Sequence, residues 1–391
     1  MSKTHEGYLL IADITGYTQY LSESELEHAQ DTLTALLELL VAHTRSPLVI
    51  SRLAGDAVIC YGLGEDFFAG QTFIEKIEDT YVTFRKAIER LVLNNTCGCN
   101  ACANISSLDL KFFIHFGTFG IQRISEHDEL VGSDIILLHR LLKNRVTEAT
   151  GFRAYTLYTK AAIQALAVDE LGKTMILHKE TYEHLGEVQV FVQDLHPVWK
   201  KKRSATALTF PMDRLLDRSA IDIRMSPERV WDYLTQPEFR NTLVGSDRME
   251  LANREHGRVA PGSVYQCYHG EEWVPQTILE WQPFERMLTR ELSFDFPDVA
   301  AVVEYGLAPT EGGTRLTKLF ARPTGPLLGR MLVRLFMPLY SRWIGKRVLE
   351  AFKLEIENDY RAHNKALAIE TEFTGKQIRE AAEASLHDSS D

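Results

Sequence analysis

Two short stretches of the sequence decide the predicted fold: LIADITGYT at residues 10–18 and RLAGDA at residues 52–57. In the first, an apolar run ends at Asp13 and a turn-forming Thr-Gly pair follows, which is typical of a buried strand. In the second, Gly55-Asp56 separates two strand-like runs and predicts a hairpin. If these strands pair, the carboxylates of Asp13 and Asp56 come close together.

The segments around these stretches alternate between strand and helix patterns. Strands are predicted over 8–13, 48–52, 58–61 and 108–119, and helices over 22–44, 73–93 and 135–142. The resulting order β-α-β-β-α-β predicts an α+β fold, a ferredoxin-like core with helices on one face of an antiparallel sheet. Segments 174–177 and 188–192 would extend that sheet.

Two carboxylates that meet at a strand end suit chemistry on a phosphate group. Hard divalent cations such as Mg2+ or Mn2+ bind carboxylate oxygens, and two of them can neutralise a polyphosphate. Directly after Asp13 the chain enters a helix, so backbone N–H groups there would face an anion. We therefore expect a metal–phosphate site made of Asp13, Asp56 and the segment Ile14, Thr15, Gly16 and Tyr17.

The two motifs, with two later ones, carry a resemblance to a known family. Residues 10–18 and 52–57, then IHFG at 114–117, then LVGSD at 130–134 leading to Arg140, are similar in order to the motifs of class III adenylyl and guanylyl cyclases. The resemblance implies conversion of a nucleoside triphosphate to a cyclic nucleotide plus pyrophosphate by a two-metal mechanism. It also implies a homodimer, with Arg140 contacting phosphate charge in the transition state.

Three positions depart from the family pattern. Ile136 occupies the place of a ribose-orienting asparagine, and an isoleucine cannot donate a hydrogen bond. Arg52 falls at the base-selecting lysine, and Glu129 falls near its acidic partner; an arginine has donors and no acceptor. The implied activity therefore has an alternative, a catalytically degenerate module that binds a nucleotide or dimerises.

Three thiols lie within six residues, at Cys97, Cys99 and Cys102. Thiolates at this spacing suit Zn2+, which needs four ligands in a closed structural site. His115 or His139 is the expected fourth ligand, unless a partner subunit supplies it. A redox role and simple free thiols are the alternatives.

The second half resembles a different family. A strand, a helix that begins at Ser226-Pro227, five strand-like segments and one long helix over 327–360 follow in order. This order, with residues 221–231, is similar to START-like domains, also called SRPBCC or polyketide-cyclase-like. The resemblance implies a helix-grip fold around a cavity for a small hydrophobic ligand. We expect a cyclase-like domain over 1–198, a linker over 199–206, a START-like domain over 207–365, and a helical to disordered tail over 366–391.

The second half offers candidates for a binding surface but no clear catalytic set. Aromatic residues that could line the cavity, or simply fill the core, are Trp231, Tyr233, Trp273, Trp281, Phe294 and Phe296. The long helix mixes arginines with large apolar residues, so it could lie on a membrane surface or pack on the sheet. Ligand sensing is the expected role, with enzymatic activity of this half as another hypothesis.

Composition narrows the class of protein. The formal net charge of −11 argues against a general nucleic-acid binder, whose footprint is basic. No transmembrane stretch or signal-peptide pattern is visible. Five cysteines among 391 residues do not make a disulfide framework. Together these features predict a cytoplasmic signalling protein in which a cyclase-like domain is coupled to a domain that binds a hydrophobic ligand.

Overall fold

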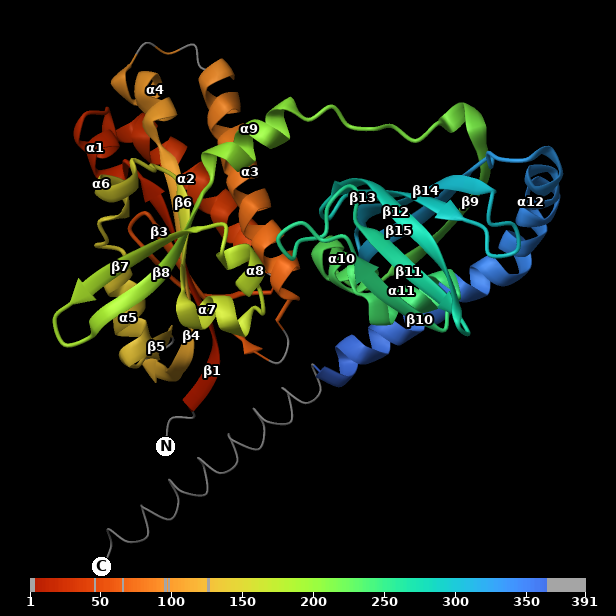
Figure 1. The fold of residues 1–391 in the computed structure, drawn as a ribbon. Helices are drawn as coiled ribbons and strands as arrows, with labels where there is room; N and C mark the ends of the chain where they lie inside the picture. The colour runs from red at the N-terminus through yellow and green to blue at the C-terminus, as the bar shows by residue number, and fades with distance from the viewer. Residues whose placement is uncertain are drawn as a thin grey trace, which may run out of the picture. The chain divides into compact units, whose positions relative to one another are not determined.

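The computed structural model describes residues 4–45, 47–64, 67–94, 97, 99–124 and 127–363. The chain forms two compact units, with the boundary between Ala205 and Thr206 (Figure 1). The tail predicted over 366–391 lies outside the described residues. No helix in the described part of the chain is both long enough and apolar enough to cross a bilayer.

The first unit is built on a mixed sheet in the order β2-β3-β1-β4-β6-β8-β7, with β5 paired to β4. The predicted βαββαβ core is confirmed, and among the paired strands of the described residues only β4 and β6 run parallel. The strands are β1 Thr4–Thr15, β2 Val49–Ala54, β3 Ala57–Leu63, β4 Asp109–Ile124, β5 His127–Val131, β6 Tyr155–Thr159, β7 Ile176–Tyr182 and β8 Gly186–Asp194.

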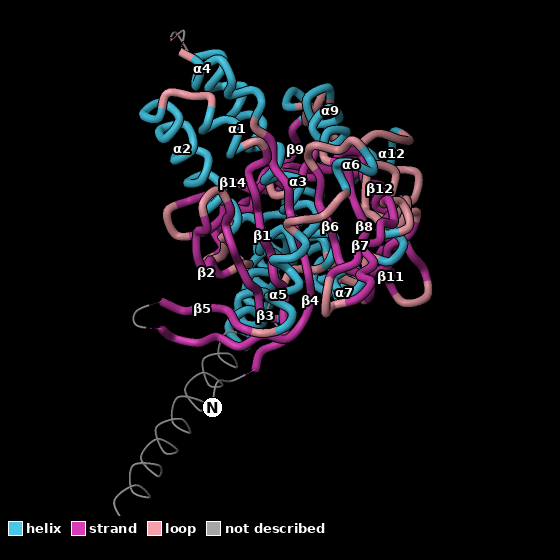
Figure 2. Tube along the Cα trace, turned by 90° about the vertical axis from the view of Figure 1, so that its left-hand side faces the viewer, coloured by secondary structure: helices cyan, strands magenta, loops and turns pink. Residues whose placement is uncertain are grey.

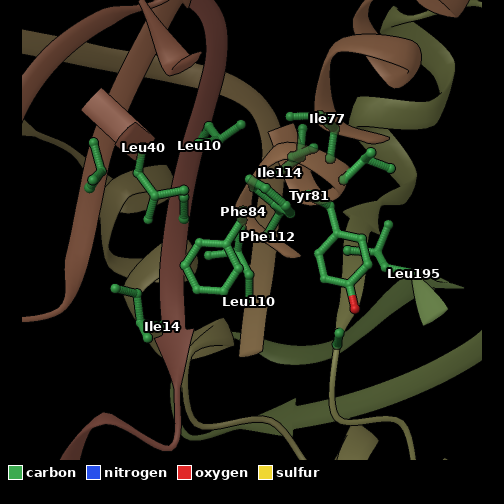
Figure 3. Packing of buried hydrophobic residues seen from close by; sticks show 14 of the residues in the cluster. Leu10, Ile14, Leu40, Ile77, Tyr81, Phe84, Leu110, Phe112, Ile114 and Leu195 are labelled. Atoms are coloured by element: carbon green, nitrogen blue, oxygen red, sulfur yellow. The ribbon is translucent and has the colours of Figure 1, made fainter. Parts of the chain in front are cut away.

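Helices cover both faces of this sheet, whereas the sequence predicted helices on one face. The helices α2 (Leu26–Thr44) and α3 (Gly70–Asn94) pack over Leu10 and Ala12 of β1. The alternate residues of β1, such as Leu9 and Ile11, point to the opposite face of the sheet, where they pack with α5 (Ser133–Leu141). Because side chains alternate along a strand, β1 contributes to two cores and is buried on both sides. Figure 3 shows the α2–α3 side of this packing.

Short helices complete the unit: α1 Tyr17–Ser22, α4 Asn100–Asn104, α6 Val146–Thr150, α7 Lys160–Ala165, α8 Asp169–Gly172 and α9 His196–Ser204. The basic run 200–203, which we expected in a linker, lies in α9. This helix has a proline in its first turn and buries Trp199, and it packs against α3. The linker prediction missed these two helix-forming features because it rested on charge alone.

The second unit is a seven-stranded antiparallel sheet in the order β10-β11-β12-β13-β14-β15-β9, with helices packed on it, as the helix-grip prediction requires. The side chain of Ser226 accepts a hydrogen bond from the N–H of Arg229 and caps α10 as predicted. The elements are β9 Leu215–Ile223, α10 Pro227–Thr235, α11 Pro237–Val244, β10 Arg248–Ala252, β11 Val264–His269, β12 Glu272–Gln282, β13 Arg286–Leu292, β14 Ala300–Thr310, β15 Gly313–Ala321 and α12 Leu327–Tyr340.

The long helix predicted over 327–360 is divided into two parts. Pro338 lies inside α12, and a π-helical turn over Ser341–Gly345 precedes a further helix over 346–363. A proline removes a backbone donor from the helix, which favours an irregularity nearby. The second part packs into the core of this unit through Leu349, Phe352 and Ile356, whereas α12 contacts β9 and exposes most of its apolar residues.

Candidate metal–nucleotide site and neighbouring centres

The carboxylates of Asp13 and Asp56 lie at one end of the central strands of the first unit. Asp13 is opposite Ala57 in the β1–β3 ladder, and the N–H of Ile14 donates to the carbonyl oxygen of Asp56 over 3.2 Å. Gly55, at φ +65°, makes the tight turn that returns the chain toward β1. The hairpin and the strand therefore bring together the two acids that the sequence singled out.

Both acids are partly buried, and their ionisation responds to that environment. Burial, followed by the neighbouring Asp56 carboxylate, raises the pKa of Asp13 to about 6, while Lys111 opposes the shift. Burial also raises the pKa of Asp56. When both carboxylates are ionised they repel one another, and a divalent cation bound between them would relieve that repulsion.

Lys111 completes this end of the sheet and was missed by sequence reasoning. It lies opposite Asp13 on β4, and its ammonium sits 5.0 Å from the centre of the Tyr155 ring. Burial lowers the pKa of Lys111, whereas Asp13 acts in the opposite direction. A lone lysine in the otherwise apolar run 110–114 of β4 was the signal that could have revealed it.

The segment after Asp13 is less open to an anion than expected. Ile14 is buried, and its N–H is already bound to Asp56, so Ile14 has no free amide to offer. Gly16 has φ +88°, and a Cβ there would lie 3.2 Å from the carbonyl oxygen of Ser107. The hydroxyl of Thr15 donates to the carbonyl oxygen of Arg153 over 3.4 Å. Of the predicted segment, Thr15, Gly16 and Tyr17 remain as candidates for ligand contact.

Arg52 and Glu129 meet in an ion pair, 2.8 Å between Nη1 and Oε2. The pair joins β2 to β5, elements that the sequence could not place side by side. The two residues matched to base selection thus neutralise one another. Burial, followed by the charge of Arg52, lowers the pKa of the nearby His139.

Arg140 lies on the outer side of α5. It is exposed in the last turn of α5, whose Leu138 and Leu141 pack on the sheet. At 100° per residue, Arg140 points away from the face that carries Asp13. Ile136 is also 56% exposed on this outer side of the helix.

The N-terminal end of α5 is fixed by Asp134. Its Oδ2 accepts from the N–H of Thr118 over 2.7 Å, and its Oδ1 lies 3.4 Å from Nε2 of His115. His115 also contacts the hydroxyl of Thr159 at 2.9 Å. His115 is therefore engaged with α5 and β6 and does not join the cysteine cluster, contrary to one of our expectations.

The cysteine cluster acquires a fourth group from α2. Nδ1 of His28 lies 3.3, 3.7 and 3.8 Å from the Sγ atoms of Cys99, Cys97 and Cys102. The predicted fourth ligand, His115 or His139, is replaced by a histidine that precedes Cys97 by 69 residues. No local spacing pattern links residues so far apart, which is why the sequence did not indicate it.

The second unit contains a cavity of about 410 Å³ beneath α12. Of the six aromatic candidates only Phe294 and Phe296 line it; the other four pack in the core or reach the surface. The wall also carries Lys318, Glu291 and Gln276. Oε1 of Glu291 accepts hydrogen bonds from the hydroxyls of Thr289 and Tyr305, at 2.8 and 3.0 Å. The cavity thus combines an apolar lining with a small polar end.

Two family models match this chain, one within each compact unit. Residues 33–150 match a family model described as a protein of unknown function (DUF2652). Residues 218–357 match the model for polyketide cyclase/dehydrase and lipid transport proteins. The chain is 28% identical over 168 residues to an uncharacterised protein of Mycobacterium tuberculosis, a match that covers 42% of this chain and 73% of that protein.

The N-terminal half matches solved structures of class III nucleotidyl cyclase domains. A bacterial light-regulated adenylyl cyclase matches at 11% identity and a TM-score of 0.35, over 52% of this chain and 57% of that one. An adenylyl cyclase from P. aeruginosa matches at 12% and 0.34, over 49% and 95%. A guanylyl cyclase domain from the aquatic fungus Blastocladiella emersonii matches at 18% and 0.32, over 49% and 97%.

Proposed function

We propose that the first unit binds a nucleoside triphosphate with two Mg2+ or Mn2+ ions and converts it to a cyclic nucleotide and pyrophosphate. The second unit would bind a small hydrophobic ligand and modulate that activity. The observation that carries the proposal is the meeting of Asp13 and Asp56 next to the turn at Thr15 and Gly16.

The charges around this pair support a site for metal and phosphate. Two partly buried acids would hold the cations, which neutralise the polyphosphate and polarise the reacting α-phosphate. Lys111 offsets part of the negative charge when no metal is bound, and it would stand beside the metals in the loaded site. In the reaction, the ribose 3′ hydroxyl loses its proton to solvent and its oxygen forms a bond to the α-phosphorus, while the bond between that phosphorus and the pyrophosphate oxygen breaks.

The position of Arg140 supports action as a homodimer. Arg140 is exposed on the outer side of α5, because Leu138 and Leu141 occupy the inner side that packs on the sheet. A second copy that presents this outer side of α5 to the carboxylates would bring Arg140 to the phosphates. A planar, permanently charged group suits that contact.

A second candidate function is favoured by Arg52, Glu129 and Ile136. The first two are paired with each other at 2.8 Å, and the third is an exposed apolar side chain where the resemblance predicts a ribose contact. These features would suit a first unit that binds a nucleotide or dimerises without turnover. The second unit would then act as the carrier of the small apolar ligand.

The cavity in the second unit supports an amphiphilic ligand. Its volume of about 410 Å³ fits a small molecule, and most of its lining is apolar. The hydroxyls of Thr289 and Tyr305 already engage Oε1 of Glu291. A ligand with an apolar body and one polar group that contacts Lys318 or Gln276 matches this distribution.

One experiment separates the two candidate functions. The purified full chain is incubated with each of the four NTPs and Mn2+, and cyclic nucleotide and pyrophosphate are quantified. We expect product from at least one NTP, and loss of product in Asp13→Asn and Asp56→Asn. Asp31→Asn, an exposed acid on α2, is the matched control and should keep full activity.

Product that survives both substitutions would refute the metal site. Nucleotide binding without product from any NTP would favour the second candidate. For the second unit, extraction of copurified small molecules from the wild-type chain, followed by mass spectrometry, would identify the ligand class. A Val333→Trp variant, whose larger side chain would occupy part of the cavity, should carry less of the same molecule.

A further inference from the structure

We infer that His28, Cys97, Cys99 and Cys102 bind one structural Zn2+ ion. The four candidate ligand atoms all lie within 4.8 Å of one another. They come from α2 and from the segment that enters α4, so a single ion would join elements far apart in the chain. This inference is independent of whether the carboxylate site turns over a nucleotide.

The distances fit a tetrahedral ion. With Zn–S bonds of about 2.3 Å and a Zn–N bond of about 2.0–2.1 Å, tetrahedral geometry places nitrogen and sulfur about 3.6 Å apart. Nδ1 of His28 lies 3.3, 3.7 and 3.8 Å from the three Sγ atoms, on both sides of that value. A centre of three thiolates and one imidazole has no open position, which is the mark of a structural site rather than a catalytic one.

Hydrogen bonds support the ligands from outside. The N–H of Cys102 donates to Sγ of Cys99 over 3.4 Å, so Cys99 caps the first turn of α4. The N–H of Ala101 donates to Oε2 of Glu25 over 2.9 Å, which is a second link between α4 and the start of α2. Such outer contacts orient metal ligands and are part of a working site.

Because of its location, the bound ion would also affect the candidate nucleotide site. The helix α4 packs against both α1 and α2, and α1 begins directly after Gly16 (Figure 2). Ser107, whose carbonyl oxygen is close to Gly16, follows α4 after only two residues. An ion that fixes α4 on α2 would thereby help to hold Ser107 against Gly16, in the turn beside Asp13.

Metal content and ligand substitution test the inference. The full chain, expressed with zinc and purified without chelator, should contain about one Zn2+ per chain by elemental mass spectrometry. His28→Ala, Cys99→Ser and Cys102→Ser should each lose at least about three quarters of the zinc. His28→Cys should keep it, because four thiolates also form a closed zinc site.

Two controls separate ligation from general damage to the fold. His184→Ala, at an exposed turn, and Cys60→Ala, at a buried free thiol outside the cluster, should retain wild-type zinc. Unchanged zinc in His28→Ala and Cys99→Ser would overturn the inference. So would a wild-type chain that contains no zinc and whose melting temperature does not rise when Zn2+ is added.

A separate observation concerns α12 and the turn that follows it. We propose that this segment lies on an anionic membrane surface. Leu328, Leu335 and Trp343 are 73%, 65% and 67% exposed, and further large apolar side chains are exposed with them: Leu327, Met331, Phe336, Leu339 and Ile344. A helix of this length with so many exposed apolar residues is unusual for a surface in water alone.

The positive charge of residues 327–349 indicates that the partner of this apolar surface is an anionic membrane. Residues 327–349 contain five basic residues (Arg330, Arg334, Arg342, Lys346 and Arg347) and no acidic residue, in a chain of net charge −11. Basic residues flanking an apolar ridge favour anionic lipid headgroups. The same helix lines the cavity through Leu332, Val333 and Met337, so contact with a bilayer would place the cavity next to a source of apolar ligand.

Vesicle sedimentation tests this proposal. We expect the full chain to sediment with vesicles of 70% phosphatidylcholine and 30% phosphatidylserine but not with pure phosphatidylcholine, and to be released by 0.5 M salt. Leu335→Glu with Leu339→Glu, two exposed positions that do not line the cavity, should reduce binding at least about tenfold. Leu93→Glu, at a leucine of α3 that is more exposed still, is the control.

Absence of binding to the anionic vesicles, or binding unchanged in the double variant, would overturn the membrane proposal. A change in oligomeric state of the double variant without any vesicle binding would instead assign the ridge to contact between protein chains. Neither outcome affects the cavity or the carboxylate site.

Discussion

At the scale of single residues, Asp13 shows how a partly buried acid is held at a cost to stability. The backbone places it between Ala57 and Lys111, and the resulting burial and the proximity of Asp56 raise its pKa to about 6. The unfolded value is close to 4. The folded chain therefore favours the protonated acid, and its stability falls as the pH rises from about 4 through about 6.

The first prediction uses this linkage. In the metal-free chain, Asp13→Asn should raise the free energy of unfolding by roughly 2–3 kcal/mol at pH 8. The effect should be small at pH 4, where the folded acid is protonated and the unfolded acid is still about half protonated. Urea unfolding at the two pH values measures the difference. Asp31→Asn is the control; an equal effect of Asp13→Asn at both pH values would contradict the shift.

Gly117 is the second residue whose identity the structure explains. A Cβ at this position would lie 2.3 Å from Oδ2 of Asp134 and 2.8 Å from Nε2 of His115. We predict that Gly117→Ala costs about 1–3 kcal/mol of stability, because the start of α5 must move away from β4. Thermal unfolding compares it with Gly312→Ala, where nothing lies within 4 Å. Equal melting temperatures for the two variants would contradict the predicted cost of a Cβ at Gly117.

At the scale of elements, the two helices at the end of the second unit have opposite roles. Phe352 is fully buried in the helix over 346–363, whereas Phe336 on α12 is 57% exposed. We predict that Phe352→Ala destabilises this unit by about 3–5 kcal/mol, and that Phe336→Ala changes its stability by less than about 1 kcal/mol. Chemical denaturation followed by tryptophan fluorescence checks the pair, and similar losses from both would refute the division of roles.

The helices of the first unit also divide by role. The helices α2 and α3 fill one face of the sheet, and α2 in addition carries His28 to the cysteine cluster. The helix α5 fills the other face and is fixed by Asp134, which leaves Arg140 on its outer side. The elements that build the core therefore also position each group of the candidate sites.

At the scale of the whole molecule, each unit has its own core and its own sheet. We predict two calorimetric unfolding transitions in the full chain. Phe352→Ala should lower only one transition temperature, and Gly117→Ala should lower only the other. If both variants shift one common transition, the units unfold together and their coupling is stronger than separate cores imply.

Much of this protein is determined by sequence alone. The βαββαβ order, the hairpin at Gly55-Asp56, the cap at Ser226 and the helix-grip order are local patterns of period, turn and cap, which neighbouring residues fix among themselves. Tertiary structure decided the rest: Lys111 beside Asp13, His28 with the three thiols, the pairing of Arg52 with Glu129, and which part of the last helix is buried. These contacts join residues that are distant in the chain, and only the register of the sheets and the packing of helices on them brings such residues together.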